Sequence, residues 1–173
     1  MKQWILNFVL FLTFFSHSLQ AFQKKYDIQF SFKEDGRKWS KSNTVDDAIF
    51  ELNEYYLEGQ SVDGWAELVT THFFVSKMDF TLEEFFKNFL KELSKNHLKN
   101  KIDSRIICMD ENEMMAEWWI LERGPNNQHE RVRIFRQNNH VGILRYTTKI
   151  KNEQGSKAFE KILKQATFRP FKP

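Results

Sequence analysis

Five residues in the C-terminal half of the chain combine charge and aromatic character at spacings that could bring them together. Glu117 and Trp119 lie in one segment of alternating pattern, Arg131 and Arg133 in the next, and Tyr146 in a third. Alternate residues of a strand point to the same face of a sheet, so we expect the five to form one binding face. Guanidinium groups hold anions through paired hydrogen bonds and also stack on aromatic rings. The pattern suits an anionic or aromatic ligand, and it equally suits cross-strand pairing or arginine stems packed beneath a helix.

The apolar alternation of two segments predicts how they pair. Residues 114–120 and 132–134 each place their apolar side chains on one face, and the register should bring those faces together. We therefore expect Ile120 opposite Val132. This register places Trp119 opposite Arg133 on the other face of the sheet.

A tight turn is predicted at Asn138-Asn139, because asparagine tolerates a positive φ. A two-residue turn at this point places Arg133 beside Leu144. The same turn places Arg131 beside Tyr146, which adds a third strand to the expected binding face.

Other chemistry is not indicated by the residues. The sequence has no glycine-rich phosphate loop, no zinc-protease motif and no nucleophile elbow, so we expect no enzyme and no cofactor. The histidines at 72, 97, 129 and 140 fall in separate expected elements, and no metal site is predicted. The net charge of +3 is small, and glutamates interleave with the arginines, which disfavours binding to nucleic acid.

The chain has a single cysteine, which excludes an internal disulfide. Cys108 lies among Ile106, Ile107 and Met109. These apolar neighbours predict a buried, unreactive thiol.

Residues 1–21 are typical of a cleaved signal peptide. Lys2 precedes an apolar run from Trp4 to Phe15, and small or polar residues lead to Ala21. The run is shorter than the about 20 residues that a membrane-spanning helix needs. We expect an exported protein, periplasmic or secreted, consisting of residues 22–173 as one domain without a transmembrane helix.

The rest of the chain indicates an α+β fold. Thr81 and Glu84 form a capping box before a helix expected over 82–98, and a second helix is expected from Ser156 to Ala166. Residues 33–46 are polar and are expected to form a loop, and residues 66–74 suit either a helix or a strand. We predict an antiparallel sheet of about five to six strands covered by two main helices. Strands are expected at 26–32, 48–57, 104–110, 113–122, 129–137 and 140–149.

One stretch resembles small exported bacterial proteins of unknown function. It runs from Gly59 through Ser61 to Trp65-Ala66-Glu67-Leu68-Val69-Thr70. The order of elements after it is similar to the α/β/α sandwich of the PsbP-like superfamily, which includes an extrinsic oxygen-evolving subunit and a Ran-binding import factor. The resemblance implies a non-catalytic binding or assembly protein, and it carries no catalytic residues with it.

Two functions remain open from the sequence. The first is a non-enzymatic protein that binds a protein or an envelope component. The alternative is a carrier of a small apolar ligand, because the phenylalanines of residues 82–98 could enclose a pocket against the sheet. A filled core with an exposed apolar patch would favour the first function.

Overall fold

The computed structural model describes residues 26–46, 50–75, 80–96, 101–121, 128–149 and 153–170. The predicted signal peptide at 1–21 lies outside these ranges. The strands and helices follow one another as β1 (Tyr26–Gln29), η1 (Phe32–Glu34), β2 (Trp39–Asp46), β3 (Phe50–Leu57), β4 (Glu67–Val75), α2 (Leu82–Asn96), β5 (Lys101–Met109), β6 (Glu113–Leu121), β7 (Gln128–Gln137), β8 (His140–Thr148), α3 (Glu153–Gln165) and β9 (Thr167–Pro170).

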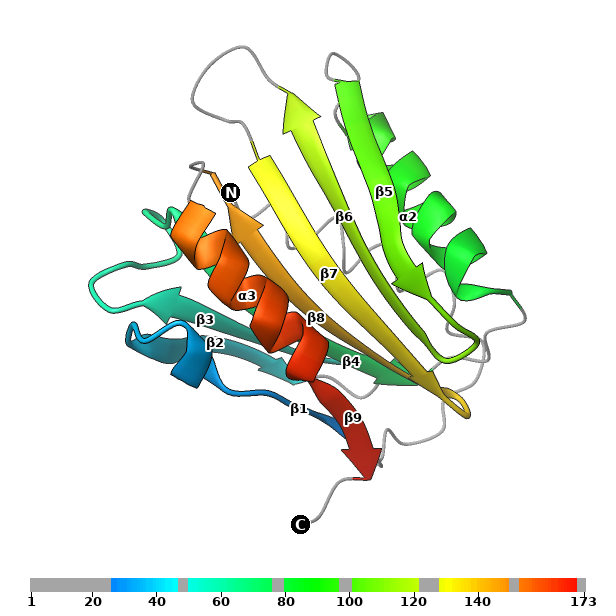
Figure 1. The fold of residues 1–173 in the computed structure, drawn as a ribbon, viewed down its shortest axis with the longest axis horizontal. Coiled ribbons are helices and arrows are strands. Elements are labelled where there is room, and N and C mark those ends of the chain that lie inside the picture. The colour runs from blue at the N-terminus through cyan, green and yellow to red at the C-terminus, as the bar shows by residue number, and fades with distance from the viewer. Residues whose placement is uncertain are drawn as a thin grey trace.

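A seven-stranded antiparallel sheet dominates the structure (Figure 1). Its order is β2-β3-β4-β8-β7-β6-β5, so two runs of consecutive strands meet where β4 pairs with β8. Strands β1 and β9 form a separate two-stranded antiparallel sheet. Within the described part of the chain, β2 and β5 are the two edge strands of the seven-stranded sheet.

The predicted sheet of five to six strands covered by two main helices is wrong. The described residues form a mostly β structure of seven plus two strands with only two α-helices. The expected loop at 33–46 contains β2, an edge strand whose outward side chains are polar because they face solvent. Of the undecided residues 66–74, all but Ala66 fall in β4. This strand is buried between two neighbours and therefore lacks the polar alternation of a half-exposed strand.

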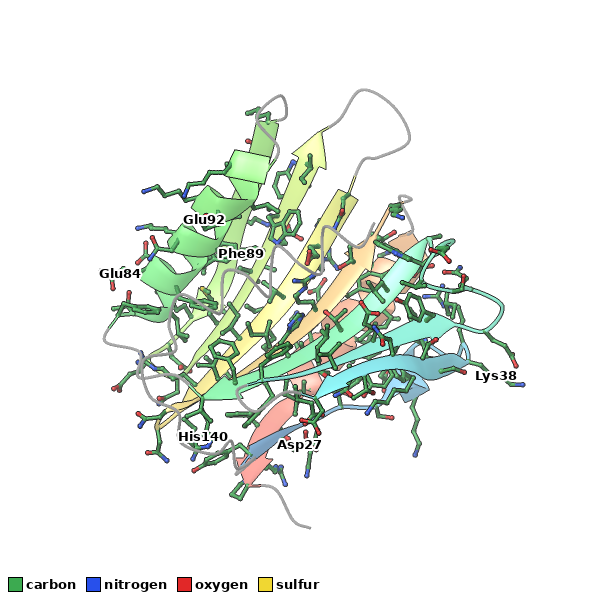
Figure 2. All side chains as sticks on the ribbon, turned by 180° about the vertical axis from the view of Figure 1, so that it is seen from behind. Asp27, Lys38, Glu84, Phe89, Glu92 and His140 are labelled. Carbon is green, nitrogen blue, oxygen red and sulfur yellow. The ribbon has the colours of Figure 1, made fainter. Side chains whose placement is uncertain are left out.

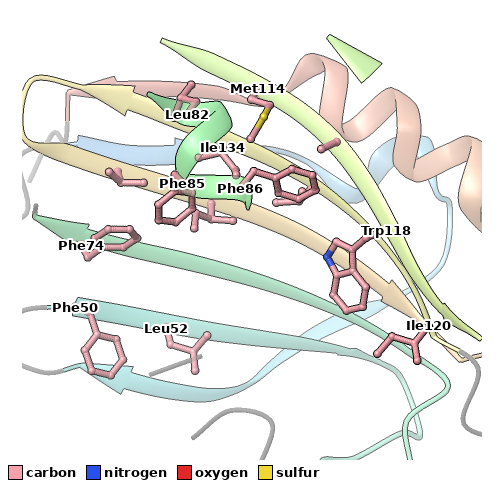
Figure 3. Close-up of a cluster of buried hydrophobic side chains, with 14 residues drawn as sticks. Phe50, Leu52, Phe74, Leu82, Phe85, Phe86, Met114, Trp118, Ile120 and Ile134 are labelled. Atoms are coloured by element: carbon pink, nitrogen blue, oxygen red, sulfur yellow. The ribbon is translucent and has the colours of Figure 1, made fainter. Parts of the chain in front are cut away.

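Helix α2 packs on one face of the sheet. Its capping box forms as predicted, since Thr81 N donates to Glu84 Oε2 at 2.8 Å and Glu84 N donates to Thr81 Oγ1 at 3.2 Å. Phe85 and Phe86 are buried against the strands (Figure 3). Seen from this side, α2 lies near β5 and β6 and away from β2 and β3 (Figure 2).

Helix α3 crosses the opposite face over β7 and β8 (Figure 1). Its predicted stripe of Phe159, Ile162, Leu163 and Ala166 is buried. The helix begins at Glu153, three residues before the predicted cap at Ser156. We refer to the two sides of the sheet as the α2 face and the α3 face.

The small sheet of β1 and β9 packs closely on β8. An added Cβ at Gly142 would lie 2.7 Å from Phe168 Cε2 and 3.0 Å from Ile28 Cγ1. Glycine at this position therefore lets the two sheets approach. The turn between β7 and β8 forms at Asn138-Asn139 as predicted, with a φ of 54° at Asn138.

Candidate functional site

The five residues of the expected binding face do share the α3 face of the sheet. Glu117 pairs with Arg131 across β6 and β7, and Arg131 pairs with Tyr146 across β7 and β8. The predicted neighbours Arg131 and Tyr146 are thus confirmed, as are Arg133 and Leu144.

The predicted register between β6 and β7 is wrong by four residues. Val132 lies opposite Ala116, not Ile120, and Trp119 lies opposite His129, not Arg133. A shift by an even number of residues leaves every side chain on its own face, so the apolar alternation alone does not distinguish the two registers.

Both arginines of this face reach the backbone of α3. Arg131 Nη1 donates to the carbonyl of Ser156 at 2.6 Å. Arg133 Nη1 donates to the carbonyls of Leu163 at 2.6 Å and Lys164 at 2.7 Å, at the end of the helix. A cation at a helix C-terminus is favourable because the last carbonyls have no partner within the helix. The two guanidinium groups therefore fasten α3 to the sheet.

Glu117 is the common partner of two arginines and one histidine beneath α3. It accepts from Arg131 Nε and His129 Nε2 at 3.1 Å and from Arg105 Nε at 2.6 Å. Burial opposes the ionisation of Glu117, but the Arg131 hydrogen bond and the neighbouring charges outweigh it and lower its pKa below 4.5. Burial also lowers the pKa of His129, against the pull of Glu117.

Tyr146 belongs to a second buried network on the same face. Its ring stacks on Phe159 with centroids 4.0 Å apart, and its hydroxyl donates to Glu67. Arg37 Nη1 donates to Glu67 Oε1 at 2.7 Å and also pairs with Asp35 at 2.9 Å. Burial, together with the Glu67 hydrogen bond, raises the pKa of Tyr146.

The expected binding face is therefore assembled, and it lies beneath α3 in ion pairs and hydrogen bonds. Trp119 is half-buried and meets His129 edge to face at 6.1 Å. These contacts match the packing alternative that the sequence also allowed. Binding of an anionic or aromatic ligand to this face stays a prediction.

The sequence analysis missed a group of buried polar residues on the α2 face. It lies on the central strands β3, β4, β8 and β7, next to the apolar cluster that α2 packs against. We call it the buried polar cluster; its members are the buried Glu54, Thr70, His72, Glu130 and Thr147, together with Arg145, whose side chain is 16% exposed. The sequence pattern that could have predicted this cluster is that all six residues occupy alternate strand positions on the side of the apolar core. Polar residues are unusual at such positions.

The centre of the buried polar cluster is the ion pair of Glu130 and Arg145, with Oε2 and Nε 2.9 Å apart. Burial raises the pKa of Glu130 to about 7, although Arg145 and Thr147 act in the opposite direction. Burial lowers the pKa of His72 well below 6.5, and the Arg145 charge adds to that shift. Buried charges with perturbed pKa values are common at functional sites and also occur in structural ion pairs.

The edge strand β5 carries several exposed apolar side chains. Three of the five exposed large hydrophobic side chains among the described residues belong to it, namely Ile106 (37% exposed), Ile107 (39%) and Met109 (46%). Cys108 is exposed as well, so the predicted burial of its thiol is wrong. The apolar neighbours of Cys108 lie at a free edge of the sheet and not in its core.

The opposite edge, β2, differs from β5 in both sequence and geometry. Its exposed side chains are polar, and its ladder with β3 is interrupted between Lys41 and Asn43. Polar residues and bulges are the usual means of keeping an edge strand from pairing with another chain. The β5 edge has a shift only near its end, between Ile106 and Cys108.

Neither α2 nor α3 is long and apolar enough to cross a bilayer. Histidine, cysteine and acidic side chains do not gather anywhere in the described ranges as a group that could hold a metal ion.

Comparisons with known proteins complete the description. The sequence matches no protein-family model, and no curated protein is similar enough to count as a relative. Among solved structures, the chain is similar to the solution structure of cyanobacterial PsbP (CyanoP) from Synechocystis sp. PCC 6803. That similarity has a TM-score of 0.47 and 10% sequence identity, and it covers 90% of this chain and 98% of that chain.

Proposed function

We propose that this is an exported, non-enzymatic protein that binds another protein chain in an assembly or binding role. The observation that carries the proposal is the exposed apolar edge of β5. An edge strand presents unpaired backbone donors and acceptors, and a second chain can add to it as a further strand. Apolar side chains on such an edge add buried area to the backbone hydrogen bonds.

The packing of the α2 face favours this function over the carrier of an apolar ligand. Phe85 and Phe86 are each 3% exposed and belong to one cluster with Phe74, Met114 and Trp118 (Figure 3). Phe85 and Phe74 have ring centroids 6.3 Å apart, within the range of aromatic contact. The phenylalanines that suggested a pocket therefore pack against the sheet as a core.

Export is supported by the pattern of residues 1–21, and it has its own test. We expect the protein recovered from the exported fraction to begin at Phe22, because small residues end at Ala21. Intact-mass spectrometry measures this directly. A mass that includes Met1 would contradict the cleavage, and recovery of the protein from the cytoplasmic fraction alone would contradict export.

Introducing positive charges at the β5 edge tests the binding function. Ile107→Lys combined with Met109→Lys should lower recovery of the cross-linked partner by about tenfold or more, because lysine is among the residues that protect edge strands from pairing. Val75→Lys is the matched control, since Val75 is 43% exposed and lies on β4. Cross-linking in the exported fraction followed by mass spectrometry gives the readout.

Two results would refute the binding function. One is a partner that the β5 variant and the Val75→Lys control recover to the same extent as the wild type. The other is the absence of any cross-linked chain, including a second copy of this one, from the wild-type sample.

A further inference from the structure

The first half of β5 is self-complementary when it is read against itself in the antiparallel direction. Residues 102–106 read Ile-Asp-Ser-Arg-Ile. About Ser104, Ile102 opposes Ile106 and Asp103 opposes Arg105. We propose that two copies of this chain pair through their β5 edges, antiparallel about Ser104, and join their sheets into one. This inference rests on the proposed function and names its partner as a second copy.

The side chains of this segment divide correctly between the two faces of the sheet. Ile102 and Ile106 lie opposite Ile120 and Ala116 of β6, on the α2 face. Asp103 and Arg105 lie on the α3 face, opposite Trp119 and Glu117. Cross-strand neighbours share a face, so the paired edges would form two isoleucine contacts on one side and two ion pairs on the other.

Two other antiparallel registers of the β5–β5 pair would also keep each side chain on its own face of the sheet. Both are disfavoured by repulsion between like charges. Centring the pair on Asp103 would oppose that residue to its own copy and Lys101 to Arg105. Centring it on Arg105 would oppose two arginines. Like charges directly opposite each other destabilise a sheet, so Ser104 is the favoured centre. The bulge between Ile106 and Cys108 begins where the self-complementary segment ends.

The charged groups needed for the pairing remain accessible. The Arg105 side chain is 66% exposed although its Nε donates to Glu117 at 2.6 Å, and guanidinium has further donors on its two terminal nitrogens. The Asp103 side chain is 33% exposed and contacts Lys101 Nζ at 3.0 Å. A closed two-fold arrangement uses the same residues on both copies, as is usual for homodimers.

A charge-swap experiment tests this register. Protein purified from the exported fraction of cells expressing the full chain is analysed by sedimentation equilibrium over a range of concentrations. We expect the wild type to dimerise, and Asp103→Arg and Arg105→Asp each to weaken dimerisation by about tenfold or more, because each places like charges opposite. An equimolar mixture of the two variants should dimerise again, since it opposes two arginines with two aspartates. The double variant carrying both changes should dimerise alone.

A cysteine cross-link checks the centre independently of charge. In a Cys108→Ser background, Ser104→Cys places its thiol opposite its own copy and should give a disulfide-linked dimer under mild oxidation. Ser42→Cys in the same background is the matched control, because Ser42 is also exposed on an edge strand, β2, and should stay monomeric. Circular dichroism of each variant verifies that it is folded.

The outcomes separate this inference from the proposed function. A monomeric wild type, or single variants that dimerise as well as the wild type, would overturn the dimer. If the wild type is monomeric but the β5 variants recover less of a different cross-linked protein, only the dimer proposal is refuted. If no chain depends on β5, both the dimer and the proposed function fail.

Discussion

Replacing Arg145 with methionine should lower the free energy of unfolding by about 3–5 kcal/mol at pH 8, because it leaves the Glu130 carboxylate buried without its charged partner. Glu130 is 1% exposed, and its Oε2 lies 2.9 Å from Arg145 Nε. At pH 5 the loss should be smaller, because Glu130 can then take up a proton. Urea melts at the two pH values measure the difference.

The direction of the pH effect follows from the pKa of Glu130. Burial raises that pKa to about 7 in the folded protein, compared with 4.5 for the unfolded chain. The folded state therefore binds more protons between these values, and its stability is fully present below pH 4.5 and lost as the pH rises through 7. At 1.36 kcal/mol per pKa unit, the wild type should lose about 3 kcal/mol relative to Glu130→Gln across this range.

Glu130→Gln is the control that isolates this contribution. His72 titrates in the opposite sense, because its lowered pKa removes stability as the pH falls below 6.5. Both proteins retain His72, so its effect cancels in their difference. A difference that does not change with pH would contradict a raised pKa for Glu130, and an Arg145→Met loss that is equal at pH 5 and pH 8 would contradict the ion pair.

Trp118→Ala should lower the free energy of unfolding by about 3–5 kcal/mol, because it empties the largest buried position of the α2 face. Trp118 is 1% exposed, and its ring lies 6.0 Å from that of Phe89 on α2. The neighbouring Trp119 gives a matched control with the same side chain on the other face. Since Trp119 is only half-buried, Trp119→Ala should cost about 1–2 kcal/mol.

Urea melts of the two variants compare the faces directly. Equal losses would mean that α2 does not close a filled core over Trp118, and they would return the carrier of an apolar ligand to consideration. A larger loss at Trp119 would contradict the assignment of faces in β6.

The helices could be predicted from the sequence because their signals are local. The capping box of Thr81 and Glu84 fixes where α2 begins, and the stripe from Phe159 to Ala166 identifies the buried side of α3. The turn at Asn138-Asn139 is local in the same sense. Each of these signals is a pattern of residue types within a few positions of one another.

The strands that were missed depend on distant neighbours. Residues 39–46 become β2 only because β3 provides a ladder for a polar segment, and residues 67–75 become β4 by pairing with β8 some seventy positions later. The register of β6 and β7 has the same origin. Apolar alternation specifies a face but allows shifts of two or four residues, so it does not decide among these registers.

The candidate sites differ in how far the sequence could reveal them. Alternation placed the five residues of the expected binding face on one side of the sheet, but not their neighbours across β6 and β7. The cover by α3 depends on where a later helix packs. The segment with Ile106, Ile107 and Met109 is exposed, although its apolar sequence predicted burial. Composition alone does not distinguish a core strand from an edge strand. Strand order, which no local pattern encodes, makes that distinction.

Hydrogen exchange of backbone amides tests the central claim most directly, namely that the β5 edge accepts another strand. The protein would be compared in dilute solution and in the complex isolated from the exported fraction. We predict that exchange slows on binding in residues 101–106, while the β2 edge at 39–46 is unchanged, because a new backbone ladder protects only the strand it joins. Slowing at β2 or over α3, with residues 101–106 unchanged, would contradict the account.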